Sequence, residues 1–276
     1  MERVRTGVEW LDYMIEGGLP KGTWTVLTGE PGTGKSILAM FVAGANLGEM
    51  PVVYVTTETS FHDVVEQAKQ FKIDLGNAVN LVDILTGKAK EAEDIVVIDL
   101  FGLYRQYREM VKEASEEGRR KPSRALSIEV LKGAISKAYE ALDIEKGDEA
   151  LVIIDSMTAF WADKPAMARA YSYALRQSLY RQNLTVLLTS QYAPTTEASF
   201  GFGLEHVADG IIHMWMDNVE EAKAINRWLI VKKMRLTNHA RVALKYDIVP
   251  GRGLVLIEPK LEDLKAIVPK AQPSPS

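Results

Sequence analysis

Eight consecutive residues, 29–36 with the sequence GEPGTGKS, limit what this chain can fold into more than any other stretch. They fit the pattern G-x-x-x-x-G-K-[ST], which forms a phosphate-binding loop when a strand precedes it and a helix follows it. Residues 23–28 are β-branched and aromatic, and residues 37–43 carry an apolar helical pattern. The sequence therefore predicts a strand, a loop and a helix in direct succession.

The glycines of this loop allow backbone conformations that other residues avoid, so consecutive N–H groups can turn inward around an anion. Lys35 is expected to reach the β- and γ-phosphates of a nucleoside triphosphate, and the Ser36 hydroxyl is expected to bind Mg²⁺. A glycine-rich turn that binds nothing is the alternative, and the flanking strand and helix argue against it. The residues expected to surround the nucleotide here are Gly29, Glu30, Pro31, Gly32, Thr33, Gly34, Lys35, Ser36 and Ile37.

Apolar runs and helical patterns alternate along most of the remaining chain, which is typical of parallel strands joined by helices. The next buried strands are expected at 51–57, 94–100, 151–156 and 184–191. Beyond residue 209 strand follows strand, which predicts an antiparallel extension at one edge of the sheet. These later strands are expected at 211–215, 228–233, 242–248 and 254–257. We expect an α/β fold, with one domain over residues 1–260 and a flexible tail over 261–276.

Composition excludes several classes of protein. The chain has 276 residues and no cysteine, so it has no disulfide, thiolate metal site or cysteine nucleophile. Its net charge of −4 gives no overall attraction to nucleic acid. No run approaches the roughly 18 apolar residues of a membrane helix, and the N-terminus has no apolar signal core. We therefore expect a cytoplasmic protein with no membrane partner.

Two aspartates at the ends of apolar runs could order the Mg²⁺ shell, a role that needs a strand beside the P-loop strand. Asp155 ends the run LVIID and Asp99 ends the run IVVID, and periodicity alone does not choose between them. The features that follow Asp155 favour it: a hydroxyl at Ser156, one helix, and a strand ending in Ser190-Gln191. Asp99 is then expected to end an ordinary strand and to face a solvated loop.

Other polar residues lie at predicted strand ends. Glu58 ends the strand expected next to the P-loop, where it suits a base or an orienter of attacking water, and a surface glutamate is the alternative. Gln191 ends a strand on the same rim, where its amide could sense a γ-phosphate. Lys233 and Arg235 close a later strand and project from one side of it, with His239 four residues on. Such a basic strand end is equally typical of a solvated edge.

Several motifs then occur in one order along the chain: TGV at 6–8 with GGLP at 17–20, the P-loop, VTTE at 55–58, IDS at 154–156, SFGFG at 199–203, VADG at 207–210, and KMR at 233–235 with His239. Over roughly residues 4–258 this order resembles the KaiC-type branch of the RecA/RadA ATPase superfamily. In particular it is similar to the single-domain KaiC-like proteins of archaea, sometimes called RadA paralogues.

The resemblance implies a RecA-type core that hydrolyses ATP with Mg²⁺. It also implies a homo-oligomer with ATP between neighbouring subunits, either a ring, with a hexamer expected, or a filament. Lys35 and Ser36 match the phosphate and magnesium groups of the family. Glu58 matches the catalytic glutamate, and Asp155 matches the Walker B aspartate.

Lys233 and Arg235 match the lysine and arginine that reach the next subunit's nucleotide in KaiC-type hexamers, and His239 falls at the family's histidine. The likeness to RadA also suggests an accessory role in DNA recombination or repair, with single-stranded DNA or a recombinase as partner. DNA contacts would map to residues 105–124 or to Lys164 and Arg169. A nucleotide-dependent regulatory or scaffold module with slow hydrolysis is the alternative function.

Overall fold

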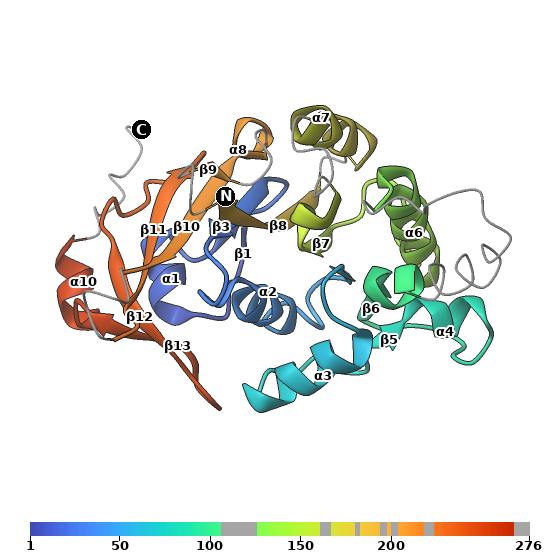
Figure 1. Cartoon of the computed structure of the whole chain (residues 1–276), viewed down its shortest axis with the longest axis horizontal. Coiled ribbons are helices and arrows are strands. Elements are labelled where there is room, and N and C mark those ends of the chain that lie inside the picture. Colours follow the sequence, from blue (N-terminus) through green and yellow to red (C-terminus); the bar gives the residue numbers. More distant parts are fainter. Residues whose placement is uncertain are drawn as a thin grey trace, which may run out of the picture.

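A central sheet organises the structure, a computed structural model that describes residues 1–105, 126–160, 167–179, 183–193, 198–199, 204–217 and 224–267 (Figure 1). Its main path has the strand order β13-β12-β11-β10-β3-β8-β7-β4-β6-β5, and β9 pairs with β8. The strands are β3 (Trp24–Gly29), β4 (Val52–Thr56), β5 (Val79–Asn80), β6 (Ile95–Asp99), β7 (Ala150–Asp155), β8 (Leu184–Ala193), β9 (Ala198–Ser199), β10 (Gly210–Met216), β11 (Arg227–Met234), β12 (Leu244–Val249) and β13 (Gly253–Glu258).

Helices cover both faces of this sheet (Figure 1). One face packs against α1 (Glu9–Met14), α2 (Lys35–Gly44), α3 (Phe61–Gln70) and α10 (Leu261–Ile267). The other packs against α4 (Leu81–Leu85), α6 (Ile128–Ala141), α7 (Ala168–Leu179) and α8 (Leu204–Val207), with the 3-10 turn η2 (Met157–Phe160) at the end of β7. In β4, Val52 and Tyr54 belong to the first core, and Val53 and Val55 belong to the second. Burial on both faces explains why these strands are apolar at nearly every position.

The parallel part of the sheet runs from β10 through β3 to β5, and its strand order corrects one expectation. The strands that carry Asp155 and Glu58 were expected beside the P-loop strand β3. Instead, β3 pairs with β8 and β10, so that β7 lies two places from β3 and β4 lies three places away. Periodicity identifies strands but carries no information on which strands pair, so the order could not be derived from it.

The predicted antiparallel extension is present at one edge of the sheet. Strand β10 pairs in parallel with β3, and β11, β12 and β13 follow it as antiparallel neighbours. The α/β fold with a mostly parallel sheet and a C-terminal antiparallel region is therefore confirmed. The P-loop strand consequently has neighbours on both sides.

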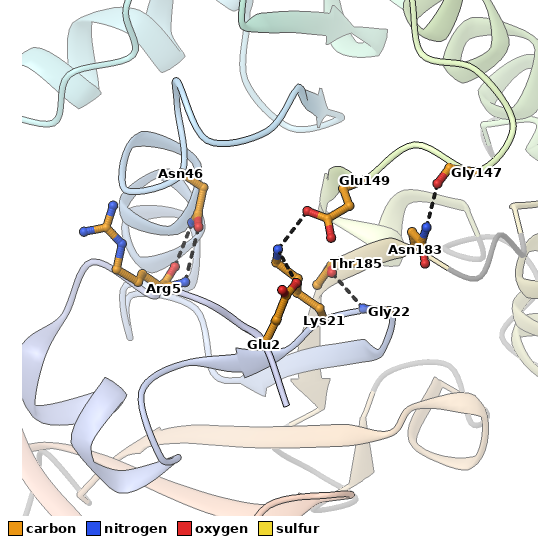
Figure 2. Close-up of polar contacts among 9 residues, drawn as sticks. All are labelled: Glu2, Arg5, Lys21, Gly22, Asn46, Gly147, Glu149, Asn183 and Thr185. Carbon is orange, nitrogen blue, oxygen red and sulfur yellow. Dashed lines mark hydrogen bonds and ion pairs between the residues drawn. The ribbon is translucent and has the colours of Figure 1, made fainter.

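The N-terminal segment is fastened to the edge of the sheet where β3 begins (Figure 2). A short pair, β1 (Arg3–Val4) and β2 (Leu19–Pro20), precedes β3. Lys21 Nζ contacts the carboxylates of Glu2 (2.8 Å) and Glu149 (2.7 Å), and Glu149 directly precedes β7. Asn46, just beyond α2, donates to the Arg5 carbonyl (2.8 Å) and accepts the Arg5 N–H (3.2 Å). These contacts tie the start of the chain to α2 and β7.

The C-terminal end of the described chain differs from the expected tail. Residues 261–267 form α10, and Leu264 is fully buried in the first core. An apolar contact with the antiparallel extension therefore orders a segment that had been assigned to a solvated tail from residue 261. Residues 268–276 lie outside the described residues. No helix in the described ranges has the length and apolar character needed to cross a membrane.

Candidate active site

A cavity of about 270 Å³ lies at the edge of the sheet where β3, β4, β7 and β8 end. It brings together most of the P-loop with Glu58, Asp155 and Gln191, which sequence patterns placed on different strands. Its lining residues are Pro31, Gly32, Gly34, Lys35, Ser36, Ile37, Glu58, Gln67, Asp155, Ser156, Thr189, Gln191 and Ile248. Gln67, Thr189 and Ile248 were missed as site residues, because nothing local in the sequence marks a position on α3, β8 or β12 as facing a cavity.

Glycine is required at two points of the P-loop. Gly34 is the N-cap of α2 with φ 89°, and a Cβ there would lie 2.7 Å from Ile248 Cδ1. At Gly29 a Cβ would collide with the Met214 carbonyl of the neighbouring strand β10. The loop can therefore turn tightly into α2, with the backbone N–H groups of the first helical turn at the cavity.

The C-terminal strands brace the P-loop from outside. Arg227 Nε donates to the Gly32 carbonyl (3.1 Å), and the Tyr246 hydroxyl donates to the Thr33 carbonyl (2.6 Å). The Glu30 carboxylate accepts the backbone N–H at the end of β10 (3.2 Å). Burial raises the pKa of Tyr246, so that its hydroxyl remains a donor at neutral pH. The loop conformation is thus held by residues about 200 positions away in the sequence.

Lys35 extends along the inside of the loop and is almost fully buried. Its Nζ donates to the carbonyls of Gly29 (3.0 Å) and Glu30 (2.7 Å). Burial lowers the pKa of Lys35 to about 8, against the opposing influence of Asp155 and Glu58. The ammonium is thus a concentrated positive charge in a poorly solvated place, which suits contact with phosphate oxygens.

Asp155 and Ser36 face the same cavity and supply oxygen atoms. One Asp155 oxygen accepts the Thr189 hydroxyl (2.6 Å), and the other accepts the Tyr54 hydroxyl (3.1 Å). Mg²⁺ is usually held by one or two protein oxygens together with nucleotide phosphates, so Ser36 and Asp155 fit this ion. Within the described ranges, no three His, Asp or Glu side chains gather into a metal site made of protein alone.

Asp99 lies outside this cavity, on β6 beyond β4. It is buried, and its carboxylate accepts the backbone N–H groups of Phe61 (2.9 Å) and Gly102 (2.6 Å). The expectation that Asp99 faces a solvated loop was therefore wrong. Its carboxylate satisfies the first turn of α3, which is a structural task common at helix starts.

Glu58 is held close to Asp155 by the ends of β4 and β7. The Thr57 hydroxyl accepts the Ser156 N–H and donates to the Ser156 carbonyl, both at 2.8 Å. Gln191 Nε2 donates to the Glu58 carboxylate (3.3 Å). Desolvation by the surrounding cavity wall, and then the negative charge of Asp155, raise the pKa of Glu58, whose side chain still reaches solvent. A carboxylate with a raised pKa beside a phosphate-binding loop can accept a proton from water.

Lys233, Arg235 and His239 are not in the P-loop cavity. They line a second cavity of about 560 Å³, together with Ile230, Val231, Lys232, Met234 and Arg241. Strand β11 begins at Arg227, beside the P-loop, and runs toward the end of the sheet where β3 begins. The six residue steps from Arg227 to Lys233 span about 20 Å of strand. Lys233 and Arg235 therefore cannot reach the nucleotide loop of their own chain.

His239 lines this second cavity. Its Nδ1 is buried, and within the described part of the chain it has no hydrogen-bond partner.

Of the segments predicted to contact DNA, residues 106–125 and 161–166 lie outside the described residues, and Lys164 is among them. Arg169 is exposed on α7, with its guanidinium 5.9 Å from the centre of the Tyr173 ring.

A glycine-rich loop that feeds a helix from β3, with three further strand ends around the same cavity, makes this chain a P-loop NTPase with a RecA-type core. The family model described as "ATPase: KaiC" matches residues 4–261, so the chain belongs to the KaiC family of ATPases. The resemblance inferred from the sequence is thereby confirmed.

Two related proteins match over nearly the whole chain. The UPF0273 protein PF1931 of Pyrococcus furiosus is 31% identical over 271 residues, covering 95% of this chain and 96% of its own length. The UPF0273 protein MK0039 of Methanopyrus kandleri is 33% identical over 258 residues, covering 90% and 89%. The crystal structure of KaiC-like protein PH0186 from Pyrococcus horikoshii matches with a TM-score of 0.67 at 23% identity, covering 93% of this chain and 99% of that one, which supports the fold.

Proposed function

We propose that this chain hydrolyses ATP to ADP and phosphate, and that neighbouring subunits share each active site. The observation that supports hydrolysis, and not nucleotide binding alone, is the cluster of Glu58, Gln191 and Asp155 beside the P-loop. A module that only holds ATP needs no carboxylate with a raised pKa at this position. The regulatory or scaffold reading therefore has less support.

The P-loop and α2 bind the triphosphate. Backbone N–H groups at the start of α2 and the Lys35 ammonium contact its oxygens, and Ser36 and Asp155 are the residues that would hold Mg²⁺. Bound Mg²⁺ supplies positive charge that neutralises the phosphate oxygens. Thr189 and Tyr54 keep the Asp155 carboxylate in one orientation through their hydroxyl groups.

Glu58 accepts the proton of the attacking water. The water oxygen forms a bond to the γ-phosphorus, its proton passes to the Glu58 carboxylate, and the bond between the γ-phosphorus and the bridging oxygen breaks. The electron pair of that bond remains on the β-phosphate of ADP. Gln191 contacts Glu58 from the neighbouring rim position, so its amide can link the γ-phosphate to the base.

Charge that develops during phosphoryl transfer calls for a further cation near the γ-phosphate, and the P-loop contains no arginine. We assign this role to Lys233 and Arg235 of the adjacent subunit, because both lie at the end of the sheet opposite the P-loop cavity. The cavity there is lined by four cations, Lys232, Lys233, Arg235 and Arg241, and Arg235 pairs with the Asp209 carboxylate beside it. His239 lines the same cavity and is assigned to the same nucleotide contact. Such a head-to-tail contact closes as a ring, with a hexamer expected, or continues as a filament.

The DNA and recombinase partners rest on the resemblance to RadA alone. The net charge of −4 gives no general attraction to nucleic acid, so any DNA binding should be weak and strongly salt-dependent. Phosphate release measured with and without single-stranded DNA tests this partner directly. A rate that does not respond to DNA leaves ATP hydrolysis in place and removes the DNA role.

Mixing two inactive variants tests the shared site. Glu58→Gln removes the base and Arg235→Ala removes the cation supplied to the neighbour. An interface that pairs the intact Glu58 of one chain with the intact Arg235 of another has both groups, so co-assembled mixtures should regain phosphate release. Arg5→Ala is the matched control, since its side chain is similarly exposed (57%, against 61% for Arg235) and also ion-paired. Wild-type hydrolysis by Arg235→Ala alone, or a co-assembled mixture that stays inactive, contradicts the proposal.

A further inference from the structure

The turn formed by residues 207–210, between α8 and β10, holds both members of the Lys233 and Arg235 pair. Lys233 Nζ donates to the Ala208 carbonyl (2.6 Å). Arg235 donates to Asp209 twice, from its backbone N–H to the Asp209 carbonyl (3.0 Å) and from its guanidinium to the Asp209 carboxylate (3.1 Å). The sequence VADG therefore organises the cationic end of β11.

This turn is itself fixed to the beginning of the P-loop strand. The Asp209 N–H donates to the Trp24 carbonyl (2.7 Å), and the Asp209 carboxylate accepts the Trp24 N–H (3.1 Å). Gly210 has no room for a side chain, since a Cβ would lie 2.7 Å from Thr25 Oγ1 and 2.8 Å from Met234 Sδ. These contacts fix the position of Arg235 relative to the central sheet and not relative to a surface loop.

Asp209 has a second cationic partner on α7. Arg176 contacts the Asp209 carboxylate at 3.0 Å, and its guanidinium lies 5.6 Å from the centre of the Trp24 ring. The side chain of Arg176 is 26% exposed, that of Arg235 is 61% exposed, and that of Asp209 is 11% exposed. The largely buried Asp209 carboxylate therefore pairs with one mostly buried arginine, Arg176, and with one mostly exposed arginine, Arg235.

This asymmetry decides which arginine can leave. Removing the only cation from a buried carboxylate is strongly unfavourable, because the remaining charge is poorly solvated. Here Arg176 and the Trp24 N–H both remain on Oδ2 of Asp209 after Arg235 turns away from Oδ1, so the carboxylate keeps a cationic partner. A phosphate group of a neighbouring subunit can therefore attract Arg235 without leaving Asp209 unpaired.

We propose that Asp209 is a positioning residue, which holds Arg235 at the subunit edge in a reachable conformation, and that Arg176 allows its release. This proposal rests on the shared active site proposed above. It gives the VADG motif at residues 207–210 a function, which is to position Arg235. Because Asp209 lies at the edge where β3 begins, it acts on the active site of the next subunit and not on the P-loop of its own chain.

The test compares phosphate release and nucleotide affinity for Asp209→Asn, Arg235→Ala and the double variant. Asparagine keeps an oxygen that accepts the Trp24 N–H, so Asp209→Asn should fold. It should slow phosphate release by on the order of tenfold to a hundredfold, as expected for a misplaced catalytic group, and leave nucleotide affinity unchanged. In the Arg235→Ala background it should cause no further loss. Asp99→Asn is the matched control, because Asp99 and Asp209 are each 8% exposed as whole residues and bond backbone N–H groups.

Co-assembly with Glu58→Gln separates positioning from a folding defect. Mixed assemblies should recover activity, because the Glu58→Gln chain contributes an intact Asp209 and Arg235 to the intact base of its neighbour. If Arg235→Ala is slow and restored by mixing but Asp209→Asn hydrolyses ATP normally, only the positioning role is overturned. An Asp209→Asn defect that mixing does not restore also overturns it. Wild-type activity of Arg235→Ala overturns the shared site itself.

Arg176→Gln provides a second variant in case Asp209→Asn does not fold. It keeps the carboxylate and, among the described residues, leaves Arg235 as the one side chain ion-paired with Asp209. Hydrolysis should therefore slow while nucleotide affinity stays constant, since Asp209 now retains Arg235. Unchanged or faster hydrolysis by folded Arg176→Gln contradicts the release step.

Discussion

Replacing Lys35 by methionine should stabilise the protein measured without nucleotide. Lys35 is 8% exposed, and burial lowers its pKa from 10.5 to about 8. This difference corresponds to about 3 kcal/mol against the charged form in the folded chain. Methionine fills a similar volume without a charge, so Lys35→Met should raise the free energy of unfolding at neutral pH. The carbonyls of Gly29 and Glu30 lose a donor, which makes about 3 kcal/mol an upper limit.

The advantage of Lys35→Met should depend on pH in one direction. Folded wild-type protein releases the Lys35 proton as the pH rises through about 8, whereas the unfolded chain keeps this proton until about 10.5. Between these values the unfolded state binds more protons, so wild-type stability increases with pH relative to the variant. The difference between the two proteins should therefore be largest below pH 8 and should shrink toward pH 10.5.

Nucleotide should reverse the order of stability. ATP and Mg²⁺ at about 100 times the dissociation constant should stabilise wild-type protein by roughly 2.7 kcal/mol, and Lys35→Met should gain nothing. Denaturant unfolding at several pH values, with and without ATP and Mg²⁺, measures both effects. Lys69→Met, at an exposed lysine on α3, controls for the substitution itself. A variant that is less stable than wild type without nucleotide refutes the burial argument, and one that keeps the ATP gain removes Lys35 from phosphate binding.

Glu58→Gln should keep nucleotide binding but lower phosphate release by about 10²- to 10⁴-fold, because the amide cannot accept the proton. In wild-type protein the rate should rise with pH through the raised pKa of Glu58, since the base must be ionised, and a plateau at low pH contradicts its role. Asp155→Asn should shift the Mg²⁺ titration of nucleotide binding to higher concentration, whereas Asp99→Asn should lower the melting temperature without moving that titration. If the two results are exchanged, the choice of aspartate is wrong. Tyr246→Phe should cost about 1 kcal/mol of stability and raise the KM for ATP, and an unchanged KM shows that the P-loop holds its shape without this hydroxyl.

The features that the sequence predicted well are those with a local signal. The P-loop strand was expected at 23–28 and is found at Trp24–Gly29, and the helix begins at Lys35 as the glycine pattern requires. The switch from helix-separated strands to consecutive strands after residue 209 was also visible, because turn residues and β-branched runs mark it directly.

Features that depend on distant contacts were not visible. Asp99 and Asp155 end similar apolar runs, and the features that follow Asp155 favoured it for the cavity, but no local pattern showed that Asp99 is buried and accepts the Phe61 N–H. The Tyr246 hydroxyl donates a hydrogen bond to the Thr33 carbonyl, 213 positions away in the sequence, and no local sequence pattern predicts such a bond. Leu264 likewise belongs to the core because it packs with residues of the antiparallel extension, a contact that the local sequence does not indicate.

The distance between the two cavities has a consequence for how binding and hydrolysis are divided. One chain contains the P-loop, Lys35 and Glu58, so under the proposed mechanism most of the affinity for nucleotide comes from a single subunit. The cations assigned to the transition state lie about 20 Å along β11 at the other edge of the sheet, fixed there by Ala208 and Asp209. If subunits share the active site as we propose, the hydrolysis rate depends on the contact between subunits, because groups that act only in the transition state change rate and not affinity. We therefore expect single subunits to bind ATP and assembled subunits to hydrolyse it efficiently.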